Sequence, residues 1–247
     1  MPRYLILLFV AIALAGCGPS LAERKDESKV HYELGVVHLG DNNLTEALKE
    51  LTRAVETYPE DPSYHNALGL AYFYKGMNDK AVESIKRAVK LDPDFSEARN
   101  NLAAVYIDEG RWDDAISQSE AALENIFYST PELALYNMGV AWYNKGNYEK
   151  AAESLRKAGS EQPAYAKAFR FLGMTYDRMG KYGEAAEAYR RAVRVQPGYV
   201  DAHFRLGLTL VKLDDKKGAL EAFSRVVEIA PESEMARSAR EYIDLIR

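Results

Sequence analysis

The sequence predicts an all-α solenoid built from six copies of one helical hairpin and closed by a C-terminal capping helix. Two observations predict this fold: a residue pair that recurs at a nearly constant interval, and further positions that keep the same phase. The pairs are separated by 34, 34, 36, 34 and 34 residues, and they are Leu34-Gly35, Leu68-Gly69, Leu102-Ala103, Met138-Gly139, Leu172-Gly173 and Leu206-Gly207. A fixed period of this length is typical of stacked repeats, in which each unit needs a neighbour to cover its apolar face.

Other positions of the period have constant chemistry. The twentieth residue is always alanine, which lets two helices cross closely: Ala47, Ala81, Ala115, Ala151, Ala185 and Ala219. Residues that tolerate a left-handed backbone stand between the paired helices: Asn42, Gly76, Gly110, Gly146, Gly180 and Asp214. Most units close on a proline, which ends the preceding helix: Pro59, Pro93, Pro163, Pro197 and Pro231. We therefore place the repeats at 28–61, 62–95, 96–131, 132–165, 166–199 and 200–233.

The last segment, 234–247, has apolar residues at helical spacing and charged residues between them. A helix of this kind covers the exposed end of a solenoid, so we expect a cap.

The period and its fixed positions resemble the tetratricopeptide repeat family over 28–233. The resemblance implies a right-handed superhelix whose first helices line a concave groove. The expected groove residues are Tyr32, Val36, Leu39, Asn66, Leu70, Phe73, Tyr74, Asn100, Ala104, Ile107, Tyr136, Val140, Tyr143, Asn144, Arg170, Met174 and Arg178. An open stripe of aromatic and aliphatic residues, more cationic near its end, predicts a protein or peptide partner. The alternative is that some of these side chains only complete the packing between repeats.

The amino terminus predicts export and lipidation. An apolar run after Arg3 is too short to span a bilayer and ends in Leu14-Ala15-Gly16-Cys17. It resembles the lipobox of bacterial lipoproteins, which implies a signal peptide at 1–16 and diacylglycerol and palmitate chains on Cys17. Residues 17–27 are polar and predict a flexible tether. Gly18 after the cysteine favours the outer membrane, with the repeats facing the periplasm.

No motif for catalysis, metal binding or cofactor binding emerges. The four histidines fall at packing positions spread along the repeats, whereas a metal needs converging ligands. The pairs Asp113-Asp114 and Asp214-Asp215 open second helices, where carboxylates are expected to cap free amides and meet the helix dipole. A formal net charge of −5 argues against a nucleic-acid partner. We expect a protein that is not an enzyme, with no cofactor, no metal and no small-molecule substrate.

A narrower resemblance rests on the one irregular spacing. Asn100-Asn101 stands just before the third key leucine, and a longer connection from Asn125 to Pro131 leads into Asn137-Met138-Gly139. These features resemble the type IV pilus pilotin lipoproteins (PilF, PilW and Tgl), which are also lipid-anchored six-repeat proteins. The resemblance implies a partner in the secretin, the outer-membrane pore of the pilus machine, and a role in its localisation and multimerisation. Two departures are Leu102-Ala103 in the third repeat and the simple terminal helix. A general envelope adaptor, for barrel assembly or for cell-wall enzymes, stays open as the alternative.

Overall fold

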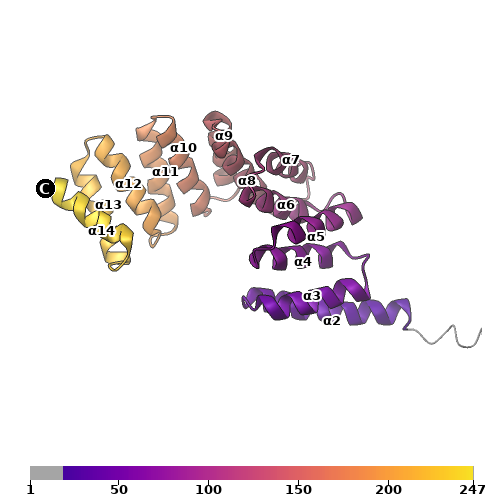
Figure 1. Ribbon diagram of the computed structural model, residues 1–247. Helices are drawn as coiled ribbons and strands as arrows, with labels where there is room; N and C mark the ends of the chain where they lie inside the picture. The colour runs from indigo at the N-terminus through magenta and orange to yellow at the C-terminus, as the bar shows by residue number, and fades with distance from the viewer. Residues whose placement is uncertain (1–18, 247) are drawn as a thin grey trace, which may run out of the picture. The chain divides into compact units, whose positions relative to one another are not determined.

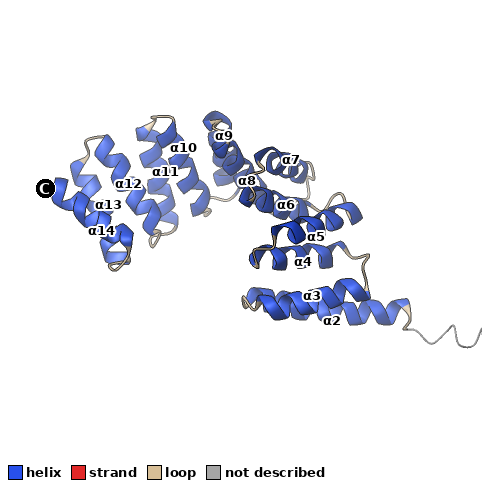
Figure 2. Cartoon of the chain, in the orientation of Figure 1, coloured by secondary structure: helices blue, strands red, loops and turns tan. Residues whose placement is uncertain are grey.

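The computed structural model describes residues 19–246, and these residues form thirteen helices and no strand (Figures 1 and 2). The predicted signal peptide and Cys17 lie outside the described residues. The helices are α2 (Leu21–Gly40), α3 (Leu44–Thr57), α4 (Pro62–Tyr74), α5 (Asn78–Leu91), α6 (Ser96–Asp108), α7 (Trp112–Leu123), α8 (Pro131–Asn144), α9 (Tyr148–Glu161), α10 (Ala166–Arg178), α11 (Tyr182–Val195), α12 (Val200–Lys212), α13 (Lys216–Ile229) and α14 (Glu234–Ile246). The predicted all-α repeat fold is confirmed.

The contacts divide the chain into two compact units, one up to Ala98 and one from Arg99. In the first unit α2 pairs with α3 and α4 with α5, and in the second α8 pairs with α9, α10 with α11 and α12 with α13. The second helix of one hairpin also contacts the first helix of the next, as α7 does with α8 and α9 with α10. Each unit is therefore a stack held together by neighbour contacts.

The turns inside the hairpins have the left-handed backbone that the sequence predicts. The residues with positive φ are Asn42, Gly76, Gly110, Gly146, Gly180 and Asp214, with φ between 57° and 80°. The amide of the residue after each turn glycine bonds back to the helix, as in the contact of Met77 N–H with the carbonyl of Tyr72 at 2.9 Å. These turns end the first helix and reverse the chain.

In five of the six hairpins, the glycine of the recurring pair meets a large side chain of the second helix. A methyl group added to Gly35 would lie 2.5 Å from Leu51 Cγ, and one added to Gly139 would lie 2.6 Å from Leu155 Cγ. The third hairpin has the reverse arrangement, because the register places Ala103 opposite Ser119, and both are 0% exposed. The extra methyl group of Ala103 is thus matched by a smaller partner.

Small residues make the layer between successive hairpins. In the second unit, alanine meets alanine where a second helix packs on the next first helix. The clusters contain Ala122 with Ala134, Ala158 with Ala168, and Ala192 with Ala202. The six alanines at the twentieth position are 0% exposed, as predicted. Close backbone approach explains why the sequence is so constant at these positions.

The first helix begins earlier than the sequence analysis predicts. We expected a flexible tether through residue 27, but α2 begins at Leu21, so the tether prediction is wrong for residues 21–27. Ser20 and Glu23 form a capping box, in which Ser20 Oγ accepts from Glu23 N–H at 3.2 Å and Glu23 Oε2 accepts from Ser20 N–H at 2.7 Å. The sequence contains the Ser-x-x-Glu motif of this capping box, but residues 21–27 lack the apolar stripe that predicts a helix.

The apolar face of α2 has no neighbour within the described residues. Val30, Leu34 and Val37 are 55%, 46% and 59% exposed. The equivalent residues of the fifth repeat are at most 5% exposed, and they are Ala168, Leu172 and Thr175. Among residues 19–246, nothing covers this surface of the first hairpin.

The other end is covered as predicted. Helix α14 packs on α13 through Ala236, Ala239 and Ile243, and the rings of Tyr242 and Phe223 stack at 5.1 Å. Its register continues the repeat, because Ala236 stands where a seventh unit would have its third residue. The cap thus occupies the place of a seventh first helix.

The irregular connection between α7 and α8 is an ordered turn. Asn125 Oδ1 accepts from Phe127 N–H at 2.9 Å, and Tyr128 is buried in a cluster with Ala122 and Ala134. Ile126 and Phe127 are 87% and 86% exposed. Two large apolar side chains therefore stand out from the loop.

No helix within 19–246 combines the length and apolar character needed to cross a membrane.

Candidate functional site: the inner surface of the first helices

The second unit has a hollow of about 440 Å³ on its first helices, which we call the inner hollow. It is lined from α8, α10, α12 and α14 by Tyr143, Met174, Asp177, Arg178, Arg205, Leu208, Val211, Lys212 and Tyr242. Four consecutive first helices, the cap included, thus contribute to one concave surface. The lining combines three cations, one carboxylate, two tyrosine rings and three aliphatic or thioether side chains.

Asp177 is the most highly bonded group of the inner hollow. Its carboxylate accepts from Tyr189 Oη–H at 2.9 Å and from Thr209 Oγ1–H at 3.1 and 3.2 Å, and it pairs with Lys212 Nζ at 3.4 Å. Tyr189 is 0% exposed. Burial, followed by the charge of Asp177, raises the pKa of the Tyr189 hydroxyl above its ordinary value, so this group is a permanent donor. Asp177 therefore joins the second helix α11 to the next first helix α12.

Asp201 organises the cations behind this surface. It accepts from Arg170 Nη1 at 2.9 Å and from Arg205 Nε at 2.9 and 3.0 Å. Arg170 Nη1 also lies 3.3 Å from the sulfur of Met174. The side chains of Arg170 and Asp201 are only 19% and 22% exposed, so this pair is fixed more firmly than a surface ion pair.

A cluster of rings continues the surface toward α8. Tyr143 packs edge-on against Phe171 at 5.4 Å and against Tyr148 at 5.5 Å, and Tyr136 packs against Phe171 at 5.8 Å. The guanidinium of Arg178 lies over the rings of Tyr143 and Tyr148, 5.9 and 5.1 Å from their centroids. Rigid rings with a cation at their edge form an anchoring surface for another chain.

The structure places the predicted groove residues of the second unit in three environments. Tyr143, Met174 and Arg178 line the inner hollow, and Tyr136 and Arg170 lie next to it in the contacts above. Asn144 is exposed and donates to the carbonyl of Val140 in its own helix at 2.9 Å, and Ala104 and Ile107 are partly exposed on α6. Asn100 and Val140 are only 8% and 7% exposed, and Asn100 accepts two hydrogen bonds from Asn137 Nδ2. These last two residues present little surface.

The predicted groove residues of the first unit lie on α2 and α4. Tyr32 packs against Tyr64 with 4.9 Å between ring centroids, and Phe73 packs against Tyr74 at 5.9 Å. Val36 and Tyr74 are exposed, at 41% and 58%. The remaining predicted residues are half-buried: Leu39, Asn66 and Leu70.

Six residues of the inner hollow are missing from the sequence-predicted groove: Asp177, Arg205, Leu208, Val211, Lys212 and Tyr242. The predicted groove residues stand at the fifth, ninth, twelfth or thirteenth position of their repeats, and Asp177, Leu208 and Lys212 stand at these positions too. Val211 stands at the twelfth position of the sixth repeat, so the same rule that selected the others finds it. Tyr242 occupies the ninth position once α14 is recognised as a seventh first helix. Arg205 stands at the sixth position and reaches the surface through its length, which no positional rule predicts.

Three of the four histidines have structural partners. His65 and His203 each place Nε2 at 2.9 Å from a carbonyl of the preceding inter-repeat turn, that of Pro59 and of Pro197. His31 Nδ1 lies 2.6 Å from Glu50 Oε2. Within the part of the chain that the structure describes, no group of three potential ligands is arranged to hold a metal ion.

The acidic pairs differ from each other. Asp215 caps α13 by accepting from Gly218 N–H at 2.9 Å, as predicted. The capping prediction is wrong for Asp113 and Asp114, because α7 begins at Trp112 without a side-chain cap. These two carboxylates instead pair with Lys145 and Arg111. Their position in the first helical turn still agrees with the predicted dipole interaction.

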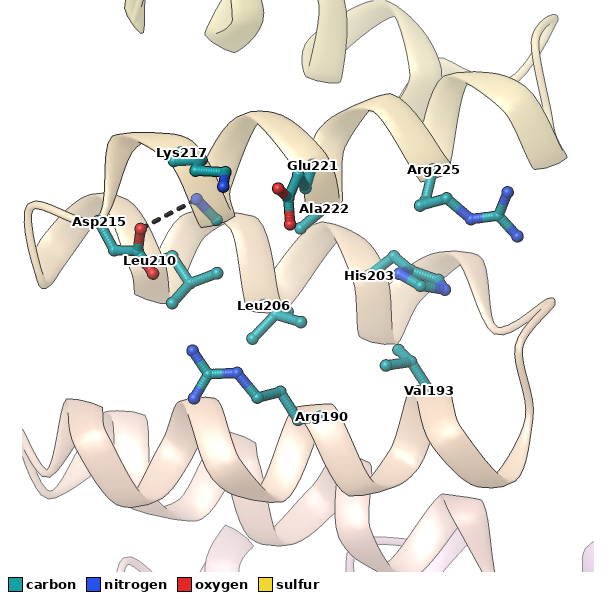
Figure 3. Close-up of a pocket in the computed structure, with 11 residues that line it drawn as sticks. Arg190, Val193, His203, Leu206, Leu210, Asp215, Lys217, Glu221, Ala222 and Arg225 are labelled. Carbon is teal, nitrogen blue, oxygen red and sulfur yellow. Dashed lines mark hydrogen bonds between the residues drawn. The ribbon is translucent and has the colours of Figure 1, made fainter.

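A second hollow, of about 430 Å³, lies between α11, α12 and α13 (Figure 3). His203, Leu206 and Leu210 form its floor, and Arg190, Glu221 and Arg225 stand around it. Burial lowers the pKa of the His203 imidazole; the hydrogen bond to Pro197 opposes this shift and the nearby Arg225 adds to it. No tyrosine, phenylalanine or tryptophan lines this hollow, which distinguishes it from the inner hollow.

Comparison with known proteins agrees with this architecture. A family model described as tetratricopeptide repeat matches residues 20–62, 66–127 and 172–234, and a second model of the same description matches residues 131–198. No protein with curated function matches the sequence.

Solved structures show the same fold. PilW, described as a widely conserved type IV pilus biogenesis factor, has a TM-score of 0.80 at 22% identity, over 86% of this chain and 98% of that one. PilF of Pseudomonas aeruginosa has a TM-score of 0.77 at 16% identity, over 88% and 98%. YrrB, described as a TPR protein with an unusual peptide-binding site, has a TM-score of 0.59 at 21% identity, over 77% and 97%.

Proposed function

Because the chain belongs to the tetratricopeptide repeat family, we propose that it is a scaffold that holds a segment of another protein against its first helices. The observation that carries this proposal is the inner hollow, where rings and aliphatic side chains remain open beside fixed cations. An open apolar concave surface of this kind is typical of a partner site. The half-buried contacts of Asp177 and Asp201 preorganise that surface, which lowers the entropy lost on binding.

The finer proposal is that the protein is a pilotin in type IV pilus biogenesis. It is supported by the likeness to PilW, a type IV pilus biogenesis factor, over nearly the whole of both chains, and by the lipobox-like Leu14-Ala15-Gly16-Cys17. A lipid on Cys17 would fix the repeats to the periplasmic side of the outer membrane. The partner is then a secretin subunit, whose amphipathic or strand-forming segment is covered until the pore assembles.

Deleting the gene tests the pilotin role. We expect secretin monomers to persist while heat-resistant multimers fall sharply, measured by immunoblot of unboiled and boiled membranes. Complementation with the wild-type chain should restore the multimers. Complementation with Cys17→Ser should restore fewer, and the protein should move from the membrane to the soluble fraction. Normal multimers in the deletion strain would contradict the pilotin role.

A residue-level experiment tests the scaffold itself. The double variant Phe73→Ala with Tyr143→Ala removes one predicted groove ring from each unit and should capture less partner from membranes. Its thermal unfolding should stay close to that of the wild type. Phe127→Ala is the matched control, because it removes an exposed ring from outside the inner hollow. An early melt of the double variant would show that these rings serve the core instead.

The partner recovered decides between the two envelope roles. A photo-crosslinking amino acid at Leu208, within the inner hollow, should capture a secretin subunit in living cells. Capture of barrel-assembly proteins or cell-wall enzymes instead would favour the general envelope adaptor. No captured protein at all would contradict the scaffold.

A further inference from the structure

We propose that the inner hollow selects an acidic partner segment, in which carboxylates flank one apolar side chain. This inference rests on the proposed scaffold function and adds the chemistry of the segment that is held. It follows from three features of the hollow: an excess of cations, one cation without a carboxylate partner, and an apolar floor.

The excess of cations is local to this surface. Arg178, Arg205 and Lys212 line the inner hollow, whereas Asp177 is its only acidic lining residue among those described. Asp177 already accepts hydrogen bonds from two hydroxyl groups and pairs with Lys212. Its charge is therefore directed into the protein and offers little to an incoming cation. The chain as a whole is acidic, at −5, so the cationic surface is not a consequence of composition.

The guanidinium of Arg178 is available to bind an anion. Among residues 19–246 no carboxylate forms an ion pair with it, and the rings of Tyr143 and Tyr148 hold its guanidinium in place. Ring faces orient a cation without neutralising it. Arg205 uses Nε for Asp201, and no described residue occupies its terminal nitrogens. Two guanidinium groups are thus available for charge-assisted hydrogen bonds, the strong class for carboxylates.

The floor of the hollow accepts an apolar side chain. Met174, Leu208 and Val211 line the same hollow as the cations, and Tyr143 and Tyr242 contribute rings. A volume of about 440 Å³ suits one or two large side chains. A neutral segment would cover the cations without pairing them, and a basic one would repel them. Acidic residues around a leucine or aromatic residue satisfy both parts of the surface.

Three labelled peptides of equal length test this chemistry on the full chain in detergent. Each has one central leucine flanked on both sides by two aspartates, two asparagines or two lysines. Measured by fluorescence anisotropy, the aspartate peptide should bind about ten-fold more tightly than the asparagine peptide. The lysine peptide should bind most weakly. Added salt should reduce the advantage of the aspartate peptide, because the cations are accessible to solvent. Equal binding of the aspartate and asparagine peptides, or no binding of any peptide, overturns the proposal.

Variants locate the effect. Arg178→Gln with Lys212→Gln should weaken the aspartate peptide about ten-fold and the asparagine peptide by much less. Lys217→Gln is the matched control, since Lys217 lines the second hollow and should change neither (Figure 3). Circular dichroism of all variants should show the wild-type melting curve. An aspartate peptide that binds equally well to the double variant overturns the assignment to this hollow.

The outcomes separate this inference from the function on which it rests. If aspartate and asparagine peptides bind equally and both are lost in Tyr143→Ala, the scaffold stands and the acidic preference falls. If the crosslinker at Leu208 captures no envelope protein, the scaffold falls whatever the peptides show.

Discussion

At the scale of single residues, the inner surface is held by buried polar contacts behind the groups that face solvent. Asp177 illustrates this arrangement, because it lines the inner hollow and also satisfies the hydroxyl of a fully buried tyrosine. A buried hydroxyl without its acceptor loses free energy that the unfolded chain recovers from water. The shape of the surface and the stability of the stack therefore depend on the same carboxylate.

Asp177→Ala should lower the free energy of unfolding by about 2 kcal/mol, because it leaves the hydroxyls of Tyr189 and Thr209 without their acceptor. Asp177→Asn, which keeps an acceptor oxygen, should cost less. Urea denaturation followed by circular dichroism measures both. Asp113→Ala is the control, because that side chain is 83% exposed and should change stability by less than about 0.5 kcal/mol. Equal costs at positions 177 and 113 would contradict the buried role.

His203 gives stability a pH dependence. Burial lowers the pKa of its imidazole in the folded protein below the unfolded value of about 6.5. Between these two values the unfolded chain binds more protons, so stability is complete above about pH 6.5 and declines as the pH falls. We expect His203→Gln to lose less stability than the wild type between about pH 7 and pH 5. Identical slopes for the two proteins in urea titrations would show that His203 does not contribute.

At the scale of the element, the close contact between the two helices of each hairpin depends on one pair of facing residues. Five hairpins place glycine opposite a large side chain, and the third places Ala103 opposite Ser119. The hydroxyl of Ser119 is buried without a hydrogen-bond partner within the described residues. The third hairpin therefore buries an unpaired hydroxyl group where the other five hairpins have a leucine, isoleucine, tyrosine or phenylalanine side chain.

A double-mutant cycle tests this interpretation. Ser119→Leu alone should destabilise by about 1–3 kcal/mol, because its side chain meets the methyl group of Ala103. Adding Ala103→Gly recreates the pattern of the other hairpins, removes the unpaired hydroxyl and should restore at least wild-type stability. Thermal unfolding of the single and double variants gives the coupling. Additive costs would show that the two residues do not face each other.

At the scale of the whole molecule, the two ends of the repeat array differ. Helix α14 covers α13, whereas no residue of the described part of the chain covers Val30, Leu34 and Val37 on the first hairpin. In a solenoid, stability is the sum of each repeat and its neighbour contacts, so a repeat with one neighbour is weaker than one with two. Of the six hairpins that the structure describes, the first should therefore be the least stable.

Hydrogen exchange measures this difference directly. Amides of α2 and α3 should exchange faster than those of α8–α11, which have a neighbour on both sides. Binding of any chain to the exposed face of α2 would slow exchange there. Equal protection in the two regions of the isolated protein would contradict the neighbour-contact account.

The sequence alone determined the repeated hairpin, the left-handed turns, the alanine layers and the cap, because these depend on residue types at fixed intervals. Within one hairpin, Gly139 leaves room for the side chain of Leu155, and Asn42 adopts the positive φ that reverses the chain. The predicted start of the first repeat, at residue 28, is too late. Helix α2 begins at Leu21, after the capping box of Ser20 and Glu23.

Only the tertiary structure decided which side chains form the inner hollow. Asn100 and Val140 stand at groove positions of their repeats but are nearly buried. Arg205 does not stand at a groove position, yet its side chain lines the inner hollow. The pairing of Asp177 with Tyr189 and Thr209 joins residues from three helices. Exposure and charge pairing of this kind depend on side-chain length and on neighbours in space, which a periodic pattern along the chain does not record.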